Sequence, residues 1–189
     1  MAAIPSRFWF RLAADCLRQG RVVAYPTEAV YGLGSDPFDA KAVYRLLALK
    51  NRSVAKGLVL IASDYDPIES LISVPSQEVA ERLSKSWPGP VTYVIRAAPG
   101  VPAWLRGGRD TLAVRVTAHP VARELCRIFG GAIVSTSANR SHFPPAKTAV
   151  KLRKYFGIEE VVLLPGDLGD CRQPTPIYDA LTGGQLRAG

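Results

Sequence analysis

Basic side chains gather in the segment Lys50-Asn-Arg-Ser-Val-Ala-Lys56. From residue 40 to residue 62 the sequence has no acidic residue. Lys50, Arg52 and Lys56 lie between a predicted helix and an apolar strand, where cations repel one another unless an anion joins them. A guanidinium binds two phosphate oxygens at once, and each ammonium adds a point charge. The segment indicates phosphate binding. The alternative is a helix C-terminus that carries cations because the helix dipole favours them there.

Two further polar segments follow predicted strands, where open α/β sheets place their ligands. Tyr25-Pro-Thr-Glu-Ala-Val-Tyr-Gly-Leu-Gly34 offers the Thr27 hydroxyl and two glycines that allow a close approach of backbone to a ligand. It is not GxGxxG, no Walker lysine motif occurs, and a tight turn explains the segment equally well. Ser135-Thr-Ser-Ala-Asn139 offers three hydroxyls and an amide, with a simple turn as the alternative.

Arg115 interrupts the apolar run Thr-Leu-Ala-Val-Arg-Val. An arginine in such a strand either lies on a solvated face or points into a pocket that holds an anionic partner. We expect the second arrangement, with the guanidinium at a pocket wall.

Histidine and cysteine are too few and too widely spaced to form a zinc site or a catalytic Cys/His or Ser/His/Asp set. The chain has two histidines and three cysteines, and no CxxC pair. No zinc site can be assembled, and no protein side chain is predicted to bind a metal. No Ser/His/Asp or Cys/His set is evident, so covalent catalysis is not favoured. An enzyme with these residues would act by holding reactants together and neutralising phosphate charge.

Hydrophobic periodicity predicts an alternation of helices and strands. Helices are expected over 8–19, 39–50, 75–87, 119–129 and 147–156, and strands over 21–25, 57–62, 91–96, 111–116, 132–135, 161–164 and 177–181. Asp39 is the expected N-cap of the second helix, and Thr117 that of the fourth. Several connections are short or contain proline. They favour a mixed α/β sheet, formed by one domain over residues 1–189.

The composition is that of a globular protein with a basic surface. Hydrophobic residues make up 48% and charged residues 21%, and the net charge is +8. This charge favours polyanionic partners such as nucleotides or RNA. The longest apolar run, residues 57–62, is too short to cross a bilayer, and the N-terminus does not resemble a signal peptide. We expect a cytoplasmic protein without membrane contact.

The polar segments, in this order along the chain, resemble those of the YrdC/TsaC threonylcarbamoyl-AMP synthases. The resemblance lies in PTEAVYGLG, Lys50-x-Arg52 and Ser137-Ala-Asn139, with support from SWPGPVTYVI, TLAVRVTAHP and PTPIYD. It implies an open, twisted, mixed α/β sheet with flanking helices around a basic cavity. It also implies synthesis of threonylcarbamoyl-AMP and pyrophosphate from ATP, bicarbonate and L-threonine, with Mg²⁺ accompanying ATP. The product would be passed on by proteins of the TsaD, TsaB and TsaE type to the tRNA adenosine beside the anticodon.

The resemblance also implies roles for individual residues. Lys50 and Arg52 would be catalytic. The ATP site would contain Lys50, Arg52, Lys56, Thr111, Ser137, Asn139, Pro145 and Arg187, and the threonine site Thr27, Arg115, Ser135 and Thr175. Longer relatives have threonine where this chain has Ala29 and histidine where it has Ile61, and both of those positions lie on the threonine side.

Two other functions would suit a chain of this kind. A basic concave surface would also suit a module that binds double-stranded or structured RNA, for example in ribosome maturation. Hydrogenase-maturation proteins carry a similar domain linked to carbamoyl transfer, but those are large multidomain chains.

Overall fold

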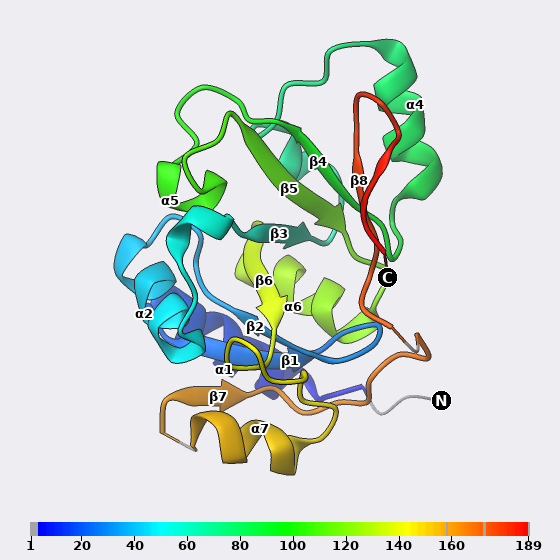
Figure 1. Ribbon diagram of the computed structural model, residues 1–189. Coiled ribbons are helices and arrows are strands. Elements are labelled where there is room, and N and C mark those ends of the chain that lie inside the picture. Colours follow the sequence, from blue (N-terminus) through cyan, green and yellow to red (C-terminus); the bar gives the residue numbers. More distant parts are fainter. Residues whose placement is uncertain (1–3, 158, 172, 189) are drawn as a thin grey trace.

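The computed structural model describes residues 4–157, 159–171 and 173–188, and these residues share one mixed sheet (Figure 1). The nine strands have the order β7-β1-β2-β6-β3-β5-β4-β8-β9. Their bounds are β1 (Val22–Pro26), β2 (Tyr31–Gly34), β3 (Val59–Ala62), β4 (Thr92–Arg96), β5 (Thr111–Val116), β6 (Ile133–Ser137), β7 (Val161–Leu163), β8 (Ile177–Asp179) and β9 (Gln185–Arg187). The pairs β1–β7, β3–β5 and β4–β8 are parallel and the other pairs are antiparallel. The predicted mixed α/β class is confirmed.

Helices cover both faces of this sheet. They are α1 (Arg7–Arg18), α2 (Ala40–Lys50), α3 (Asp66–Glu69), α4 (Gln77–Ser86), α5 (Ala103–Arg106), α6 (Pro120–Phe129) and α7 (Ala149–Phe156), with a 3₁₀ turn at Val54–Lys56. In the described part of the chain, no helix is long and apolar enough to cross a membrane.

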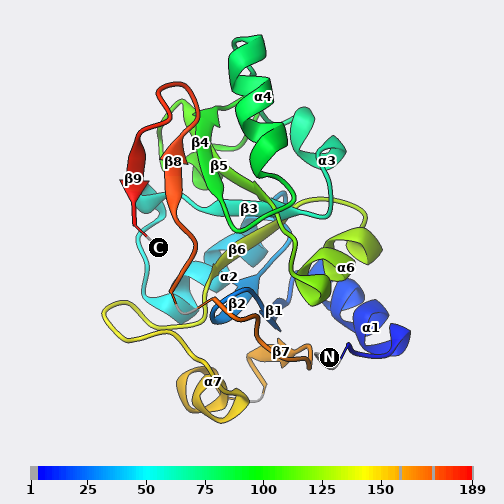
Figure 2. The ribbon, with the colours of Figure 1, turned by 90° about the vertical axis from the view of Figure 1, so that its right-hand side faces the viewer.

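Strand side chains alternate between two hydrophobic clusters, as the pleat requires. On one face, Leu60, Val114 and Val134 pack with residues of α2 and α4. On the other face, Ile61 and Ile133 pack with residues of α1 and α6, two helices that lie against each other (Figure 2). In the β3–β5 register Arg115 is the partner of Ile61, so its side chain lies on the α1/α6 face.

The sequence located most elements but missed several short ones. The 111–116 strand was predicted with its observed bounds, and the helices differ by one or two residues at their ends. The segment read as a tight turn is a hairpin in which Pro26 pairs with Tyr31 and β2 continues to Gly34. The strand β9 and the one-turn helices α3 and α5 were also missed, since three or four residues carry little periodicity.

Thr117 does not cap α6, and that prediction was wrong. The helix begins at Pro120, and the Nδ1 atom of His119 accepts the Ala122 N–H at 3.5 Å. The Thr117 hydroxyl instead donates to Glu28 Oε1 at 2.8 Å and accepts from the His119 N–H at 3.2 Å. Thr117 therefore links the end of β5 to the β1–β2 turn.

Gly34 is needed because the Tyr25 ring and the β6 backbone leave no room for a side chain. A Cβ at this position would lie 2.9 Å from Tyr25 Cε1 and 2.9 Å from the Val134 carbonyl oxygen. We expect Gly34→Ala to lower the free energy of unfolding by about 1–3 kcal/mol, the range for overpacking. Urea unfolding measures this. Gly131→Ala is the control, because a Cβ at that position would lie 3.9 Å from its nearest neighbour, Phe129 Cε1, which is an ordinary contact. Equal stability of the two variants would contradict this explanation of Gly34.

Candidate active site

A cavity of about 830 Å³ opens on the same face of the sheet as α1 and α6, although no described residue of these two helices lines it. One wall comes from β5, β6 and β3, through Thr111, Ala113, Arg115, Ser135, Ser137 and Val59. The other walls come from residues 52–58, from the end of α5 and the turn after it, and from the C-terminal segment that includes Thr175, Leu186 and Arg187. The β8–β9 hairpin, red in Figure 1, brings that last wall alongside β4.

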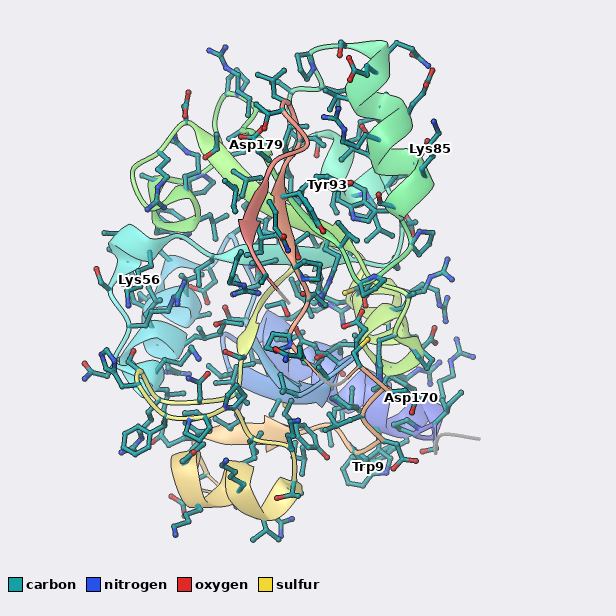
Figure 3. The ribbon with its side chains drawn as sticks, turned by 45° about the vertical axis from the view of Figure 1, so that its right-hand side comes forward. Trp9, Lys56, Lys85, Tyr93, Asp170 and Asp179 are labelled. Atoms are coloured by element: carbon teal, nitrogen blue, oxygen red, sulfur yellow. The ribbon has the colours of Figure 1, made fainter. Side chains whose placement is uncertain are left out.

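The cavity has the charge of an anion site. Among the described lining residues six are cationic and none is acidic; the six are Arg52, Lys56, Arg106, Arg109, Arg115 and Arg187. Figure 3 shows Lys56 on the turn that follows α2, whereas Lys85, on α4, lies on the opposite side of the molecule. Part of the basic charge predicted from composition is thus concentrated in one hollow, where it attracts phosphate groups.

Arg106 and Arg109 were not predicted as site residues, and a close backbone contact explains their position. Gly107 ends α5 with a φ of 62°, and a Cβ there would lie 2.6 Å from the Ala55 carbonyl oxygen and 2.6 Å from the Gly57 nitrogen. Only glycine lets the two turns approach so closely. The contact brings both arginines beside the Lys50–Lys56 segment. The Arg-Gly-Gly-Arg spacing is the sequence signal that would have found them.

Arg52 is held by its own loop and faces the other cations. Its Nη2 donates to the Gly57 carbonyl at 3.0 Å, while its buried Nε has no hydrogen-bond partner among the described residues. Burial, and then the charge of Arg187, lower the pKa of the Arg52 guanidinium. Burial, and then the charge of Arg115, lower the pKa of the Arg187 guanidinium in the same way. In both cases burial, and then a neighbouring cation, disfavours the charged form.

Arg115 lies at the cavity wall, as predicted, but it already has an anionic neighbour. It is 5% exposed, its Nη2 lies 3.4 Å from Glu28 Oε2, and its Nη1 donates to the Thr175 hydroxyl at 2.7 Å. Arg187 Nη2 donates to the Thr175 carbonyl at 2.8 Å. Thr175 therefore joins the two arginines at one end of the cavity.

Lys50 occupies a different place from the one expected of a phosphate ligand. It is 3% exposed and does not line the cavity. Its Nζ donates to the Ser137 carbonyl, to the Asn139 carbonyl at 2.8 Å and to Asn139 Oδ1 at 3.3 Å. The Ser137 hydroxyl also donates to Asn139 Oδ1, at 2.6 Å. Lys50 and Asn139 thus fix the loop that presents Ser137 to the cavity.

Burial and the nearby charge of Arg52 lower the pKa of Lys50 to about 7. Between about pH 7 and the ordinary value of 10.5, the unfolded chain holds a proton that the folded chain has released. Raising the pH therefore favours the folded state. Relative to Lys50→Met, we expect the free energy of unfolding of the parent to rise by up to about 1.4 kcal/mol per pH unit.

Urea unfolding of both proteins at about pH 7, 8 and 9 measures this difference. Subtracting the variant removes the contributions of Tyr25 and Cys126, whose pKa values are raised by burial. A difference that stays flat, or falls with pH, would contradict a proton-releasing Lys50.

The structure brings most of the predicted site residues together. Those that line the cavity are Thr27, Arg52, Lys56, Thr111, Arg115, Ser135, Ser137, Thr175 and Arg187, whereas Lys50, Asn139 and Pro145 lie outside its lining. Pro145 precedes Ala146, whose carbonyl accepts the Tyr31 N–H and whose N–H donates to the Ala138 carbonyl. At two positions this chain differs from the longer relatives. Of these, Ala29 lines the cavity, and Ile61 is fully buried in the core beneath α1 and α6.

Comparisons with known proteins agree with this architecture. Residues 15–189 match the Sua5/YciO/YrdC family model, whose description is Telomere recombination. A protein of Methylococcus capsulatus named threonylcarbamoyl-AMP synthase is 56% identical over 182 residues, which cover 96% of this chain and 98% of that protein. One of Halorhodospira halophila with the same name is 54% identical over 180 residues, covering 95% of this chain and 94% of that protein.

Solved structures share the fold. P. abyssi Sua5 complexed with L-threonine superposes with a TM-score of 0.85 at 31% identity, over 94% of this chain and 52% of that chain. This chain therefore spans about half of the Sua5 chain. E. coli YciO superposes with a TM-score of 0.81 at 23% identity, over 98% of this chain and 93% of that one. The match of the family model over most of the chain and the high identity to full-length relatives lead to one conclusion: this chain belongs to the Sua5/YciO/YrdC family.

Proposed function

We propose that this protein is an L-threonylcarbamoyladenylate synthase that uses ATP, bicarbonate and L-threonine. The observation that carries the proposal is that one cavity holds both the Arg115–Thr175 wall and, at its other end, cations with no carboxylate partner among the described residues. Relatives that match this chain along nearly their whole length are named threonylcarbamoyl-AMP synthase. A structure of P. abyssi Sua5 holds L-threonine in the same fold.

The reaction joins three substrates in two bond-forming steps. The threonine amine attacks the carbon of bicarbonate, and water leaves as the carbamate forms. A carbamate oxygen then attacks the α-phosphorus of ATP, the bond to the β-phosphate bridging oxygen breaks, and pyrophosphate leaves. The protein contributes by aligning the reactants and neutralising the negative charge of the phosphates.

The lining residues divide between the two ends of the cavity. Arg52, Lys56 and Ser137 would contact phosphate oxygens, and Thr111 would contact another part of the nucleotide. Arg187, which shares Thr175 with Arg115, would contact the nucleotide where it meets threonine. Lys50 and Asn139 would act through the loop that presents Ser137, and Pro145 through the neighbouring loop. Arg115, Ser135, Thr175 and Thr27 would hold threonine, with the Arg115 guanidinium on its carboxylate.

Mg²⁺ enters this proposal with the nucleotide, as MgATP. The described cavity residues offer hydroxyls and cations, and no carboxylate, so the ATP phosphates themselves supply the oxygens that Mg²⁺ prefers. No step is assigned to a metal held by protein side chains.

Downstream transfer is part of the same proposal. Threonylcarbamoyl-AMP is a reactive mixed anhydride, so a second enzyme system must transfer the threonylcarbamoyl group to the tRNA adenosine, with AMP as the leaving group. Proteins of the TsaD, TsaB and TsaE type would do this in the cytoplasm. The RNA-binding alternative is not favoured, because the close relatives are named as synthases. Direct tRNA contact by this chain remains a separate prediction.

Pyrophosphate release separates the synthase from a binding module. Purified protein with MgATP should release pyrophosphate only when threonine and bicarbonate are both present. Pyrophosphate release in the absence of threonine or of bicarbonate, or no release under any condition, would contradict the proposal.

A further inference from the structure

Glu28 is a buried carboxylate that does not line the cavity but lies directly behind its wall. It is 7% exposed, and its Oε1 accepts the Thr117 hydroxyl at 2.8 Å. Its Oε2 lies 3.4 Å from Arg115 Nη2 and makes no hydrogen bond among the described residues. Of the cations that line the cavity, Arg115 is the one for which the described residues include a carboxylate within ion-pair distance.

The backbone of Glu28 is fixed from two sides. The Thr27 hydroxyl and N–H both donate to the Val30 carbonyl, at 2.7 Å and 3.1 Å, which closes the β1–β2 turn. The Cys171 N–H donates to the Glu28 carbonyl at 2.9 Å. A Cβ at Gly169 would lie 2.9 Å from Glu28 Cα, so the chain packs there without a gap. The backbone from which this carboxylate extends is therefore held in place.

The charge of Glu28 also determines the net charge at one end of the cavity. Arg115 and Arg187 both bond to Thr175, and the charge of Arg115 disfavours that of Arg187. With Glu28 ionised, the three groups carry one net positive charge; without it they carry two. A singly charged end suits the one carboxylate of an amino acid, whereas a doubly charged end also attracts phosphate.

We propose that Glu28 is a positioning and specificity-determining residue, which holds the Arg115 guanidinium in place and offsets its charge so that this end accepts an amino-acid carboxylate rather than phosphate. The inference rests on the proposed function and deepens it. Phosphate groups are then directed to the other end, where the described residues give Arg52, Lys56, Arg106 and Arg109 no carboxylate within ion-pair distance. The buried Nε of Arg115, which lacks a partner in the described structure, leaves this guanidinium with unused hydrogen-bonding capacity.

Glu28→Gln tests the role of the charge, because it keeps the shape and the acceptor for Thr117. We expect the KM for threonine to rise on the order of tenfold, with a smaller change for ATP. We also expect inorganic phosphate to become competitive with threonine, whereas in the parent it competes with ATP only. This change of inhibition pattern would not follow from a merely structural role. Glu124→Gln is the matched control, since it removes the charge from an ion pair on the exposed side of α6.

Each outcome decides the inference. A folded Glu28→Gln protein with the parent's threonine KM and the parent's phosphate pattern overturns it. If Glu28→Gln does not fold, Glu28→Asp takes its place: it keeps the charge and shortens the reach, so the threonine KM should rise several-fold without new phosphate competition. An unchanged KM for Glu28→Asp overturns the positioning role.

The proposed function can fail separately. If the parent releases no threonine-dependent pyrophosphate, calorimetric titration of parent and Glu28→Gln with inorganic phosphate still tests the charge balance. An additional phosphate site in the variant supports the inference, and identical titrations of the two proteins overturn it.

Discussion

An Arg52→Ala protein should fold like the parent and lose synthase activity by roughly 10²- to 10³-fold in kcat, as when one charge-stabilising donor is removed. Arg52 lines the cavity, and the only hydrogen bond that the described structure gives its guanidinium is to the Gly57 carbonyl. The remaining donors face a space crowded with cations. Negative charge develops there as pyrophosphate leaves, so the loss should be in kcat more than in KM.

Stopped assays of pyrophosphate release, together with thermal unfolding, measure the effect. Arg153→Ala is the control, because Arg153 is an exposed arginine on α7 outside the cavity. A folded Arg52→Ala enzyme that turns over within about twofold of the Arg153→Ala enzyme would remove Arg52 from the phosphate site.

Arg115→Lys should raise the KM for threonine about 10- to 100-fold and leave that for ATP nearly unchanged, the equivalent of about 1–3 kcal/mol for a charged hydrogen bond. The planar guanidinium reaches Glu28 and Thr175 at once and still has a free nitrogen. A lysine ammonium is a single point charge and cannot contact Glu28, Thr175 and the substrate carboxylate in the same geometry.

Kinetics with each substrate varied in turn measures this. Arg96→Lys is a matched control, an exposed arginine on the neighbouring strand β4 that does not line the cavity. If the KM for ATP rises and that for threonine does not, Arg115 belongs to the nucleotide, and the division of the cavity proposed above is wrong.

The parts of this architecture that local chemistry dictates could be read from the sequence. Asp39 caps α2 through the N–H groups of Lys41 and Ala42, as its position before an apolar helical stripe predicted. The run at 57–62 contains the central strand β3, because a strand covered on both faces shows no polar alternation. Arg115 stood out as a cation within an apolar strand, and it lies at the cavity wall.

Other features depend on contacts between distant segments, which no local pattern contains. Glu28 lay within the singled-out PTEAVYGLG segment, yet its role depends on Arg115 and Thr117, which β5 brings to it. Lys50 has the residue type of a phosphate ligand, but the Ser137–Asn139 loop lies against it and takes its hydrogen bonds. Arg106 and Arg109 reach the cavity only because Gly107 packs on another turn. Gly34 was read as room for a ligand, and the space is filled by Tyr25.

The central claim is that one cavity joins threonine, a one-carbon unit and AMP. Mass spectrometry of the product formed from MgATP, L-threonine and ¹³C-bicarbonate tests it most directly. We expect threonylcarbamoyl-AMP that carries one ¹³C atom, in an amount equal to the pyrophosphate released, and roughly 10²- to 10³-fold slower formation by the Arg52→Ala protein. AMP without an attached threonylcarbamoyl group, or a product without the ¹³C label, would contradict the account.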